Sequence, residues 1–225
     1  MTKSVRAKAI VLRRTNYGEA DRVVQFLTPV GRLAALARGV RREKSKLAGG
    51  IELFAISDVV ITEGRGELGI VTSARLVTFF RHILEDYDRL QFAYEAVKQV
   101  ARASETVDEA EWFEILSEVL AALDNKTISQ KLVETWFYLR YADTLGHGLN
   151  LRVDITGASL LPEKMYMYDV SEQGLRESSA GEIGADHIKL LRLATVKSLS
   201  VLSQVSGLEP ILSVCLLTAR QHASI

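Results

Sequence analysis

The main change in the spacing of apolar residues along the 225-residue chain lies close to residue 80. Before that point the apolar segments are short, and Gly, Pro, Asn and Asp separate them where tight reversals need a positive or a fixed φ. Beyond His82 apolar residues recur every three or four positions, which is the helical period. The pattern predicts an α+β chain with a strand-rich domain at 1–80 and an all-α domain at 81–225.

The first part contains five predicted strands, at 5–14, 22–28, 32–38, 51–62 and 68–77. Five strands in so few residues favour a small closed barrel, because closure removes the exposed edges of a short sheet. In the last strand, alternation predicts that Ala74 and Leu76 face the core while Ser73 and Arg75 face water.

Two segments of the helical part match a capping box, in which a hydroxyl and a carboxylate or amide satisfy free N–H groups at a helix start. They begin at Thr106 and Thr127. The helix predicted from Thr127 to Leu145 carries apolar residues on several sides, so we expect it at the centre of a bundle. The helical period is lost between about 147 and 184, where alternation predicts a small hairpin inserted between helices.

The net charge of zero conceals two oppositely charged halves. Residues 1–81 contain 15 Lys and Arg against 7 Asp and Glu, a charge of +8, and the remainder contains 13 against 21, a charge of −8. An attractive field over one half raises its encounter rate with a polyanion, whatever the total charge. Mutual attraction of the two halves is an alternative explanation of the same split.

The sequence disfavours several classes of protein. No uncharged apolar run approaches the roughly 20 residues needed to span a bilayer, and the first apolar segment is too short for a signal peptide, so we expect a cytoplasmic protein without a membrane partner. The single cysteine, Cys215, excludes an internal disulfide and a cysteine-based zinc site. The four histidines stand far apart and no hydrolase motif is present, so we expect no metal, no cofactor and no enzyme activity.

Residues 64–69 match the G-x-G-x-x-G pattern of dinucleotide-binding loops. That pattern holds a pyrophosphate only where a helix begins within it. A strand is predicted to follow here, so we interpret this segment as a hairpin turn.

A basic segment lies between the third and fourth predicted strands. Five cations surround Glu43: Arg38, Arg41, Arg42, Lys44 and Lys46. Small barrels bind oligonucleotides through a strand face and its flanking loops, and a basic groove follows phosphates without regard to sequence. We expect these cations to bind nucleic acid, on a surface extended by Arg13, Arg14, Arg22, Arg32 and Arg65. A solvated loop that only maintains solubility is the alternative.

Three aromatic residues of the same part, Tyr17, Phe54 and Phe79, are candidates for stacking on bases. Burial in the core is the alternative for each, because aromatic residues in strands commonly pack inward.

The segment from Ala9 to Phe54 closely resembles the start of the RecO family of bacterial recombination mediators. The shared features are Tyr17-Gly18-Glu19-Ala20-Asp21, Gly31-Arg32-Leu33, Arg38-Gly39, Lys44-Ser45-Lys46-Leu47 and, further on, Gly64-Arg65-Gly66. The resemblance covers the first 80 residues well, the segment "LRYADTLGHGLNL" moderately, and the last 40 residues only in helical character.

This resemblance implies an OB-fold barrel followed by a helical domain, in a non-enzymatic protein of DNA repair. Family members anneal complementary strands and, with RecR, help RecA load onto single-stranded DNA coated by single-strand binding protein. The implied partners are therefore single- and double-stranded DNA, RecR, single-strand binding protein and, indirectly, RecA. The implied location is the bacterial cytoplasm, at the nucleoid, and the implied DNA contacts are the cations from Arg38 to Lys46.

Many family members carry a four-cysteine zinc ribbon where this chain has the insert at about 147–184. The insert contains no cysteine. We expect this zinc-free remnant to be held by apolar packing of Leu160, Leu161, Met165 and Met167, or to be mobile.

A protein of another class fits the same cations. An interaction scaffold would dock the acidic surface of a protein on the barrel, without nucleic acid. Acidic helices and phosphates require the same cations, so the sequence leaves both functions open.

Overall fold

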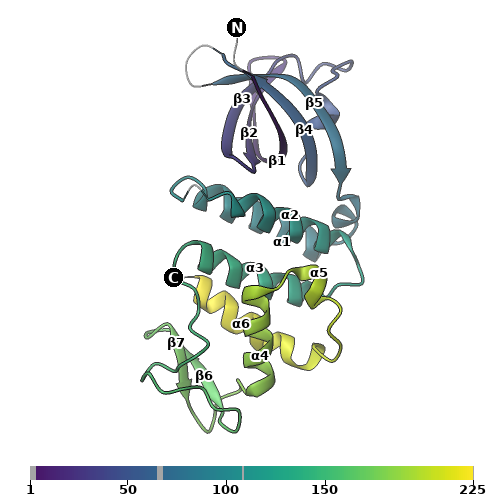
Figure 1. Cartoon of the computed structure of the whole chain (residues 1–225). Helices are drawn as coiled ribbons and strands as arrows, with labels where there is room; N and C mark the ends of the chain where they lie inside the picture. Colours follow the sequence, from purple (N-terminus) through teal and green to yellow (C-terminus); the bar gives the residue numbers. More distant parts are fainter. Residues whose placement is uncertain (1–3, 65–67, 108, 225) are drawn as a thin grey trace. The chain divides into compact units, whose positions relative to one another are not determined.

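A computed structural model, shown in Figure 1, describes residues 4–64, 68–107 and 109–224. The chain forms two compact units, Met1–Asp124 and Asn125–Ile225. The first contains a five-stranded sheet and two α-helices, and the second contains four further helices and a small hairpin.

The strands of the first unit close into a barrel, drawn in purple and blue in Figure 1. They are β1 (Ser4–Tyr17), β2 (Asp21–Thr28), β3 (Gly31–Ala37), β4 (Ala55–Thr62) and β5 (Gly69–Phe79). The order around the barrel is β1-β2-β3-β5-β4, with β3 and β5 parallel and the other neighbours antiparallel. This arrangement confirms the predicted fold class, an OB-fold barrel followed by helices.

Apolar side chains on alternate positions fill the barrel. Along β4 buried and half-buried residues alternate without a break from Ala55 to Thr62, as expected for a strand with one face on a core. Val24, Phe26 and Val59 are completely buried at the centre of this core. Closure of the sheet therefore follows from an apolar face that is continuous around the barrel.

The pairing of β4 with β5 contains two irregularities. The register shifts between Ile56 and Ser57 and between Val60 and Ile61. Each shift adds an unpaired residue to β5 and changes the face on which the next side chains lie. Ala74 is buried as predicted, but Leu76 is 42 % exposed, so the predicted inward orientation of Leu76 is wrong.

β4 begins at Ala55, four residues later than predicted. Ala48–Gly50 form a 3₁₀ turn, η1, and Phe54 adopts a left-handed φ of 55°. Gly50 lies directly on β5, because a Cβ at this position would stand 2.3 Å from the backbone oxygen of Ala74. Residues 48–54 are therefore not extended, and the loop that they end packs against the barrel.

Two helices complete the first unit, after a short 3₁₀ turn, η2 (Arg81–Glu85). They are α1 (Tyr87–Ala103) and α2 (Glu111–Asp124). Asp86 caps α1, because its carboxylate accepts hydrogen bonds of 3.1 Å from the first free N–H groups of the helix.

Both predicted capping boxes are wrong. Thr106 lies in the turn after α1, where its hydroxyl donates a hydrogen bond of 3.2 Å to the Ala103 oxygen, and Asp108 of the same predicted box lies outside the described residues. Thr127 donates its hydroxyl to Asn125 Oδ1 at 2.8 Å, and the residue before the third helix is Ser129. In both places a local turn competes with the helix for the hydroxyl group.

The change from strands to helices lies between Phe79 and Tyr87, where the sequence places it. The first compact unit nevertheless continues to Asp124, because α1 and α2 pack on the barrel. Residue 80 thus separates strands from helices, and a functional boundary there, between 1–80 and 81–225, stays a prediction.

The second unit is built around α3 (Gln130–Thr144), which packs mainly against α6 (Glu209–Ala223) and α4 (Ala185–Val196). Eight consecutive residues of α3, 132–139, are buried, as its all-round apolar pattern predicts. A short α5 (Leu199–Leu202) lies between α4 and α6. Among the described residues no helix combines the length and the apolar character that a bilayer crossing requires.

The hairpin predicted between helices is present as β6 (Tyr166–Asp169) and β7 (Gly174–Glu177). The chain around it is held to the helices of the same unit. Arg192 of α4 donates two hydrogen bonds, of 2.9 and 2.7 Å, to the backbone oxygen of Leu151.

Replacing Gly50 by Ala will destabilise the first unit by about 1–3 kcal/mol, because the new methyl group overlaps the β5 backbone. Gly49→Ala is the matched control, since nothing lies within 4 Å of a Cβ there. It will be neutral or stabilising by up to about 1 kcal/mol. Urea unfolding of the two variants measures the difference. Equal stability of the two would contradict the close approach of the loop to β5.

Candidate nucleic-acid interface

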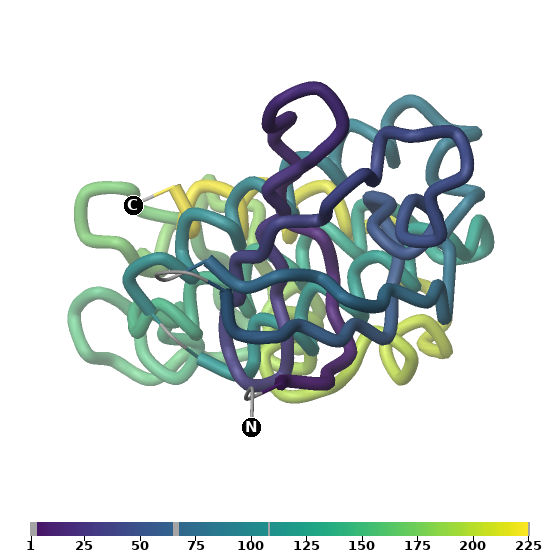
Figure 2. Tube along the Cα trace, turned by 90° about the horizontal axis from the view of Figure 1, so that it is seen from above, coloured from purple at the N-terminus to yellow at the C-terminus, as the bar shows by residue number. Residues whose placement is uncertain are grey.

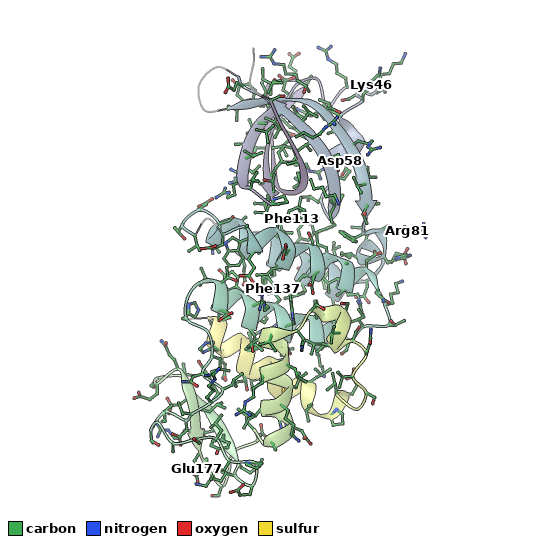
Figure 3. All side chains as sticks on the ribbon, viewed as in Figure 1. Lys46, Asp58, Arg81, Phe113, Phe137 and Glu177 are labelled. Carbon is green, nitrogen blue, oxygen red and sulfur yellow. The ribbon has the colours of Figure 1, made fainter. Side chains whose placement is uncertain are left out.

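The loop between β3 and β4 carries the basic segment. Its five cations, Arg38, Arg41, Arg42, Lys44 and Lys46, are all exposed. Arg38 directly follows the last residue of β3, and the Lys46 side chain projects away from the barrel in Figure 3. The sequence predicts that Arg38 ends the third strand and that the other four cations lie on the connection after it. The connection is confirmed for those four, and Arg38 joins them because β3 ends one residue earlier, at Ala37.

Backbone hydrogen bonds fix this loop on the turn between β1 and β2. The Gly39 N–H donates to Asp21 Oδ1 at 2.7 Å, and the Arg41 N–H donates to the Ala20 oxygen at 2.9 Å. The Arg41 side chain donates a further bond of 3.3 Å to the Gly18 oxygen. Figure 2 shows the turn, in dark purple, and the loop, in indigo, projecting on the same side of the barrel.

Gly39 and Gly18 both have positive φ, of 63° and 57°. This conformation is readily available only to glycine. The two glycines let the loop and the turn reverse direction where they meet, so that the cations after Gly39 point outward rather than into the barrel.

The loop keeps its positive charge. Across the part of the chain that the structure describes, none of the five loop cations forms an ion pair with a carboxylate. The acid within the segment, Glu43, is itself exposed. These exposed guanidinium and ammonium groups are available to phosphates without first breaking an ion pair.

Two of the predicted strand arginines are paired with carboxylates instead. Arg14 contacts Glu52 at 2.8 Å and also donates to the Ile51 oxygen at 3.3 Å. Arg32 contacts Glu105, at the end of α1, at 3.4 Å. Both arginine side chains are about one-fifth exposed, at 22 % and 21 %. Their charge is partly cancelled, and a role in nucleic-acid binding stays a prediction for them.

The remaining predicted arginines differ in position. Arg13 is exposed on β1, and Arg22, at the start of β2, donates a hydrogen bond of 3.1 Å to Asn16 Oδ1. Arg65 lies outside the described residues, and its contact with nucleic acid stays a prediction.

The three candidate stacking residues differ in how much of each side chain is exposed. Tyr17 is 60 % exposed at the end of β1, and Phe79 is 39 % exposed at the end of β5. Phe54 is only 2 % exposed. It packs inside the first unit, so of the two alternatives for Phe54 burial in the core is confirmed and stacking on bases is not.

The glycine-rich segment at 64–69 connects β4 with β5, which are antiparallel neighbours. Residues 65–67 lie outside the described residues. A strand follows the segment, as predicted, and the helix start that a dinucleotide-binding loop requires is replaced by β5.

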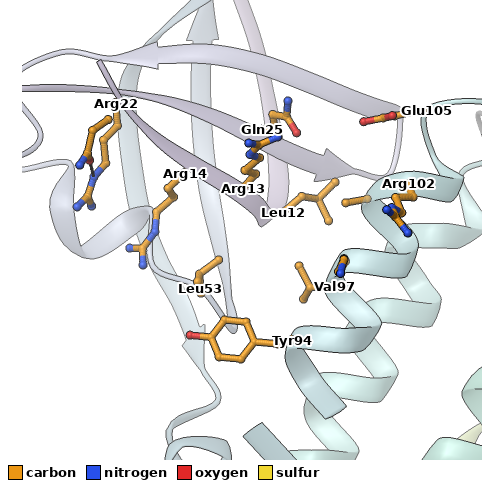
Figure 4. Close-up of a pocket in the computed structure, with 13 residues that line it drawn as sticks. Leu12, Arg13, Arg14, Arg22, Gln25, Leu53, Tyr94, Val97, Arg102 and Glu105 are labelled. Carbon is orange, nitrogen blue, oxygen red and sulfur yellow. Dashed lines mark hydrogen bonds between the residues drawn. The ribbon is translucent and has the colours of Figure 1, made fainter. Parts of the chain in front are cut away.

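A groove of about 760 Å³ runs between the barrel and α1, both within the first unit (Figure 4). Its apolar lining includes Leu12, Leu53 and Val97. Five cations line it as well: Arg13, Arg14, Arg22, Lys98 and Arg102. Glu105 is the one carboxylate among the described residues that line it. Lys98 and Arg102 were not predicted as binding residues from the sequence, although their spacing of four residues places both on one face of a helix.

Comparisons with known proteins bear on the identity of this chain. The family model described as "Recombination protein O N terminal" matches residues 1–80. The "DNA repair protein RecO" of Roseiflexus sp. strain RS-1 is 38 % identical over 143 residues, which are 63 % of this chain and 50 % of that protein. The protein of the same name from Dehalococcoides mccartyi strain 195 is 32 % identical over 157 residues, 68 % of this chain and 61 % of that protein.

The chain belongs to the RecO family. A third relative, the "DNA repair protein RecO" of Dehalococcoides mccartyi strain CBDB1, is 27 % identical over 223 residues, 95 % of this chain and 87 % of that protein. The chain spans half to three-fifths of the length of the first two relatives. The resemblance drawn from the residues is thus confirmed.

The insert of this RecO chain, at 147–184, is organised by polar contacts. The Asp154 carboxylate accepts hydrogen bonds from the Thr156 hydroxyl at 2.7 Å and from the Thr156 and Ala158 N–H groups at 2.8 and 3.0 Å. These bonds, that of the Thr156 hydroxyl above all, lower the pKa of Asp154. Within the described residues no group of three or more His, Cys, Asp or Glu could hold a metal ion.

The expected apolar packing of the insert is wrong for three of its four residues. Leu161, Met165 and Met167 are 39 %, 40 % and 47 % exposed. The buried side chains of this region are Tyr166, Leu175 and Ile183 instead. The alternation was recognised correctly, but the opposite face of the hairpin packs inward.

A buried histidine joins the insert to α6. His222 Nε2 lies 2.6 Å from the His147 backbone oxygen, and His222 Nδ1 lies 2.9 Å from the Tyr168 hydroxyl. Because a carbonyl only accepts, Nε2 carries the proton and Nδ1 accepts from Tyr168. Burial lowers the pKa of His222 and raises the pKa of Tyr168 to about 12. Burial therefore favours the neutral imidazole in this link.

Two further titratable groups of the second unit, Cys215 and His187, are at least partly shielded from water. Burial raises the pKa of the Cys215 thiol to about 12, so the thiolate that cysteine chemistry needs is absent at neutral pH. Burial also lowers the pKa of His187, whose Nδ1 accepts a hydrogen bond from the Gly184 N–H at 3.2 Å.

The free energy of unfolding of the second unit will fall as the pH decreases below about 6.5, the ordinary pKa of histidine. The folded pKa of His222 is lowered, so the unfolded chain takes up the proton first and is favoured. His222→Gln is the control, because an amide donates and accepts in the same directions but does not titrate in this range. Urea unfolding between about pH 5 and pH 8 will show a smaller pH dependence in this variant. An equal dependence would contradict the neutral histidine link.

Proposed function

We propose that this RecO-family protein binds DNA through the β3–β4 loop and acts as a recombination mediator in DNA repair. It anneals complementary single strands and, together with RecR, helps load RecA onto single-stranded DNA that is coated by single-strand binding protein. The names of the relatives support the repair role. The exposed loop cations support the binding step.

The single observation that carries the proposal is the seating of five exposed cations on a closed barrel. Two phosphate backbones repel each other, and cations that contact both reduce this repulsion while bases pair. The loop is fixed to the β1–β2 turn by hydrogen bonds from Gly39 and Arg41. Its cations are therefore held at one end of the barrel rather than spread over a mobile segment.

In this function the protein neither forms nor breaks a covalent bond. It acts in the bacterial cytoplasm, at the nucleoid, and binds both single- and double-stranded DNA. The surplus of acids from residue 82 onward, −8 in total, suits contacts with RecR and single-strand binding protein on the surfaces of that part that lie outside the DNA path.

Replacing Arg42 and Lys44 by Gln will weaken binding of a fluorescent single-stranded oligonucleotide and flatten its salt dependence. Each phosphate that is neutralised contributes about 0.7 to the slope of log affinity against log salt concentration on a single strand. The bonds that seat the loop on the β1–β2 turn come from Gly39 and Arg41, so the change acts on the phosphate contacts. Fluorescence anisotropy at several salt concentrations measures the slope.

The matched control is Lys131→Gln with Lys189→Gln, which removes the same charge from two exposed helical positions of the second unit. It will keep the slope of the unchanged protein. An unaltered slope in the Arg42 and Lys44 variant would show that the loop is not part of the binding surface. Failure of the unchanged protein to bind any oligonucleotide, with capture of an acidic protein, would favour a scaffold function.

A further inference from the structure

We propose that the groove between the barrel and α1 is a second binding subsite for single-stranded nucleic acid, which takes one or two nucleotides beyond the loop. The inference rests on the proposed function, because it names further residues on the path of the strand. The phosphates are held by Arg13, Arg22, Lys98 and Arg102, and a base lies on Tyr94.

The charge of the groove fits a polyanion. Five of the described residues that line it are cations, and one is a carboxylate. Arg14 is paired with Glu52 and Glu105 contacts Arg32, so these charges are compensated locally. Arg13, Lys98 and Arg102 are exposed, and no ion pair between them and a described carboxylate is present. These cations remain available for phosphates.

The arrangement of α1 points to a ligand. Lys98 and Arg102 lie one helical turn apart on the same face, where two like charges repel each other and weaken the helix. Both residues line the groove, and Figure 4 shows Arg102 on the helix, across the groove from Arg13 and Arg14 on the barrel. An anion between the two walls would relieve this repulsion.

Tyr94 provides a stacking surface. Its ring packs on that of Phe54, with centroids 4.9 Å apart and an interplanar angle of 72°. Phe54 is itself buried, at 2 % exposure, which fixes the orientation of the Tyr94 ring. Tyr94 nevertheless remains 48 % exposed and lines the groove. A pre-oriented, accessible aromatic ring next to cations is the combination that binds bases of single strands without regard to sequence.

The groove continues from the loop. Arg41 contacts the β1–β2 turn through the Gly18 and Ala20 oxygens. Asn16 and Arg22 flank this turn, are hydrogen-bonded to each other at 3.1 Å, and line the groove. A strand bound to the loop cations therefore reaches Arg22 by passing along the turn, and then the cations on α1.

A β-bulge shapes the barrel side of the groove. The pairing of β1 with β2 shifts its register between Val11 and Arg13. Leu12 is the additional residue, and it is buried while Arg13 is exposed. Bulges redirect side chains in this way, and here the bulge places an apolar residue at the floor and a cation at the rim.

The test is binding of a fluorescent oligothymidine to the full chain with Lys98→Gln and Arg102→Gln combined. Affinity will fall several-fold, and the salt slope will decrease by roughly 0.7 for each phosphate that the variant no longer neutralises. The Lys131 and Lys189 control will leave both unchanged. An unaltered affinity and slope would overturn the subsite, even if the Arg42 and Lys44 variant confirms the loop. Failure of the unchanged protein to bind the oligonucleotide would instead overturn the proposed function.

A second variant pair tests the stacking. Tyr94→Ala will weaken oligothymidine binding at least about fivefold, whereas Tyr94→Phe keeps the ring and will bind as the unchanged protein does. Photo-crosslinking of an oligonucleotide that contains 5-bromodeoxyuridine, followed by mass spectrometry, will locate a crosslink in α1. Binding of an acidic peptide to the groove without any crosslink or change in oligonucleotide affinity would overturn the proposal in favour of a protein partner.

Discussion

The contact between the β3–β4 loop and the barrel is the constraint on which the basic surface depends. At one end of the loop Gly50 lies so close to Ala74 that no side chain fits between them. At the other end Gly39 and Arg41 bond to the β1–β2 turn. A loop that is fixed at both ends loses less conformational entropy when it binds a ligand than a free loop would.

Charge is distributed unevenly over this framework. The loop cations stay exposed, whereas Arg14 and Arg32 are engaged by Glu52 and Glu105. Each such partly exposed pair contributes only about 0–1 kcal/mol to stability. Its larger effect is to confine the positive field, because the two carboxylates cancel arginines that would otherwise extend the basic surface along the strands. In the proposed path a strand passes from the loop cations along the β1–β2 turn to the groove, where Asn16 and Arg22 line the entrance side.

Sequence patterns predicted the barrel and the helical part because both depend on the period of apolar residues. They did not predict Leu76, because a β-bulge changes the face of a strand without changing the composition of the segment. They left stacking and core burial both open for Phe54 and did not single out Tyr94, although the two rings contact each other. Which of two neighbouring aromatics is covered depends on tertiary packing, and local spacing carries no information about it.

The candidate site, like the fold, could be predicted from the sequence only in part. The exposure of the cations from Arg38 to Lys46 followed from their position between two strands. The carboxylates that engage Arg14 and Arg32 are 38 and 73 residues away along the chain, so no local pattern could identify them. Lys98 and Arg102 lie in a part of the chain with an acid surplus, so their positive charge did not stand out in the sequence. Their proximity to the barrel is a tertiary contact that local spacing does not reveal. The insert was recognised, but its attachment through His222 is likewise a long-range contact.

The central claim is that the loop after β3, fixed on the β1–β2 turn, is where this RecO-family protein meets DNA. Amide hydrogen exchange of the full chain, measured with and without a saturating single-stranded oligonucleotide, tests it most directly. Bound DNA will slow exchange at residues 38–46 and 16–22. Protection confined to the helices of the second unit, with exchange in both of these segments unchanged, would contradict it.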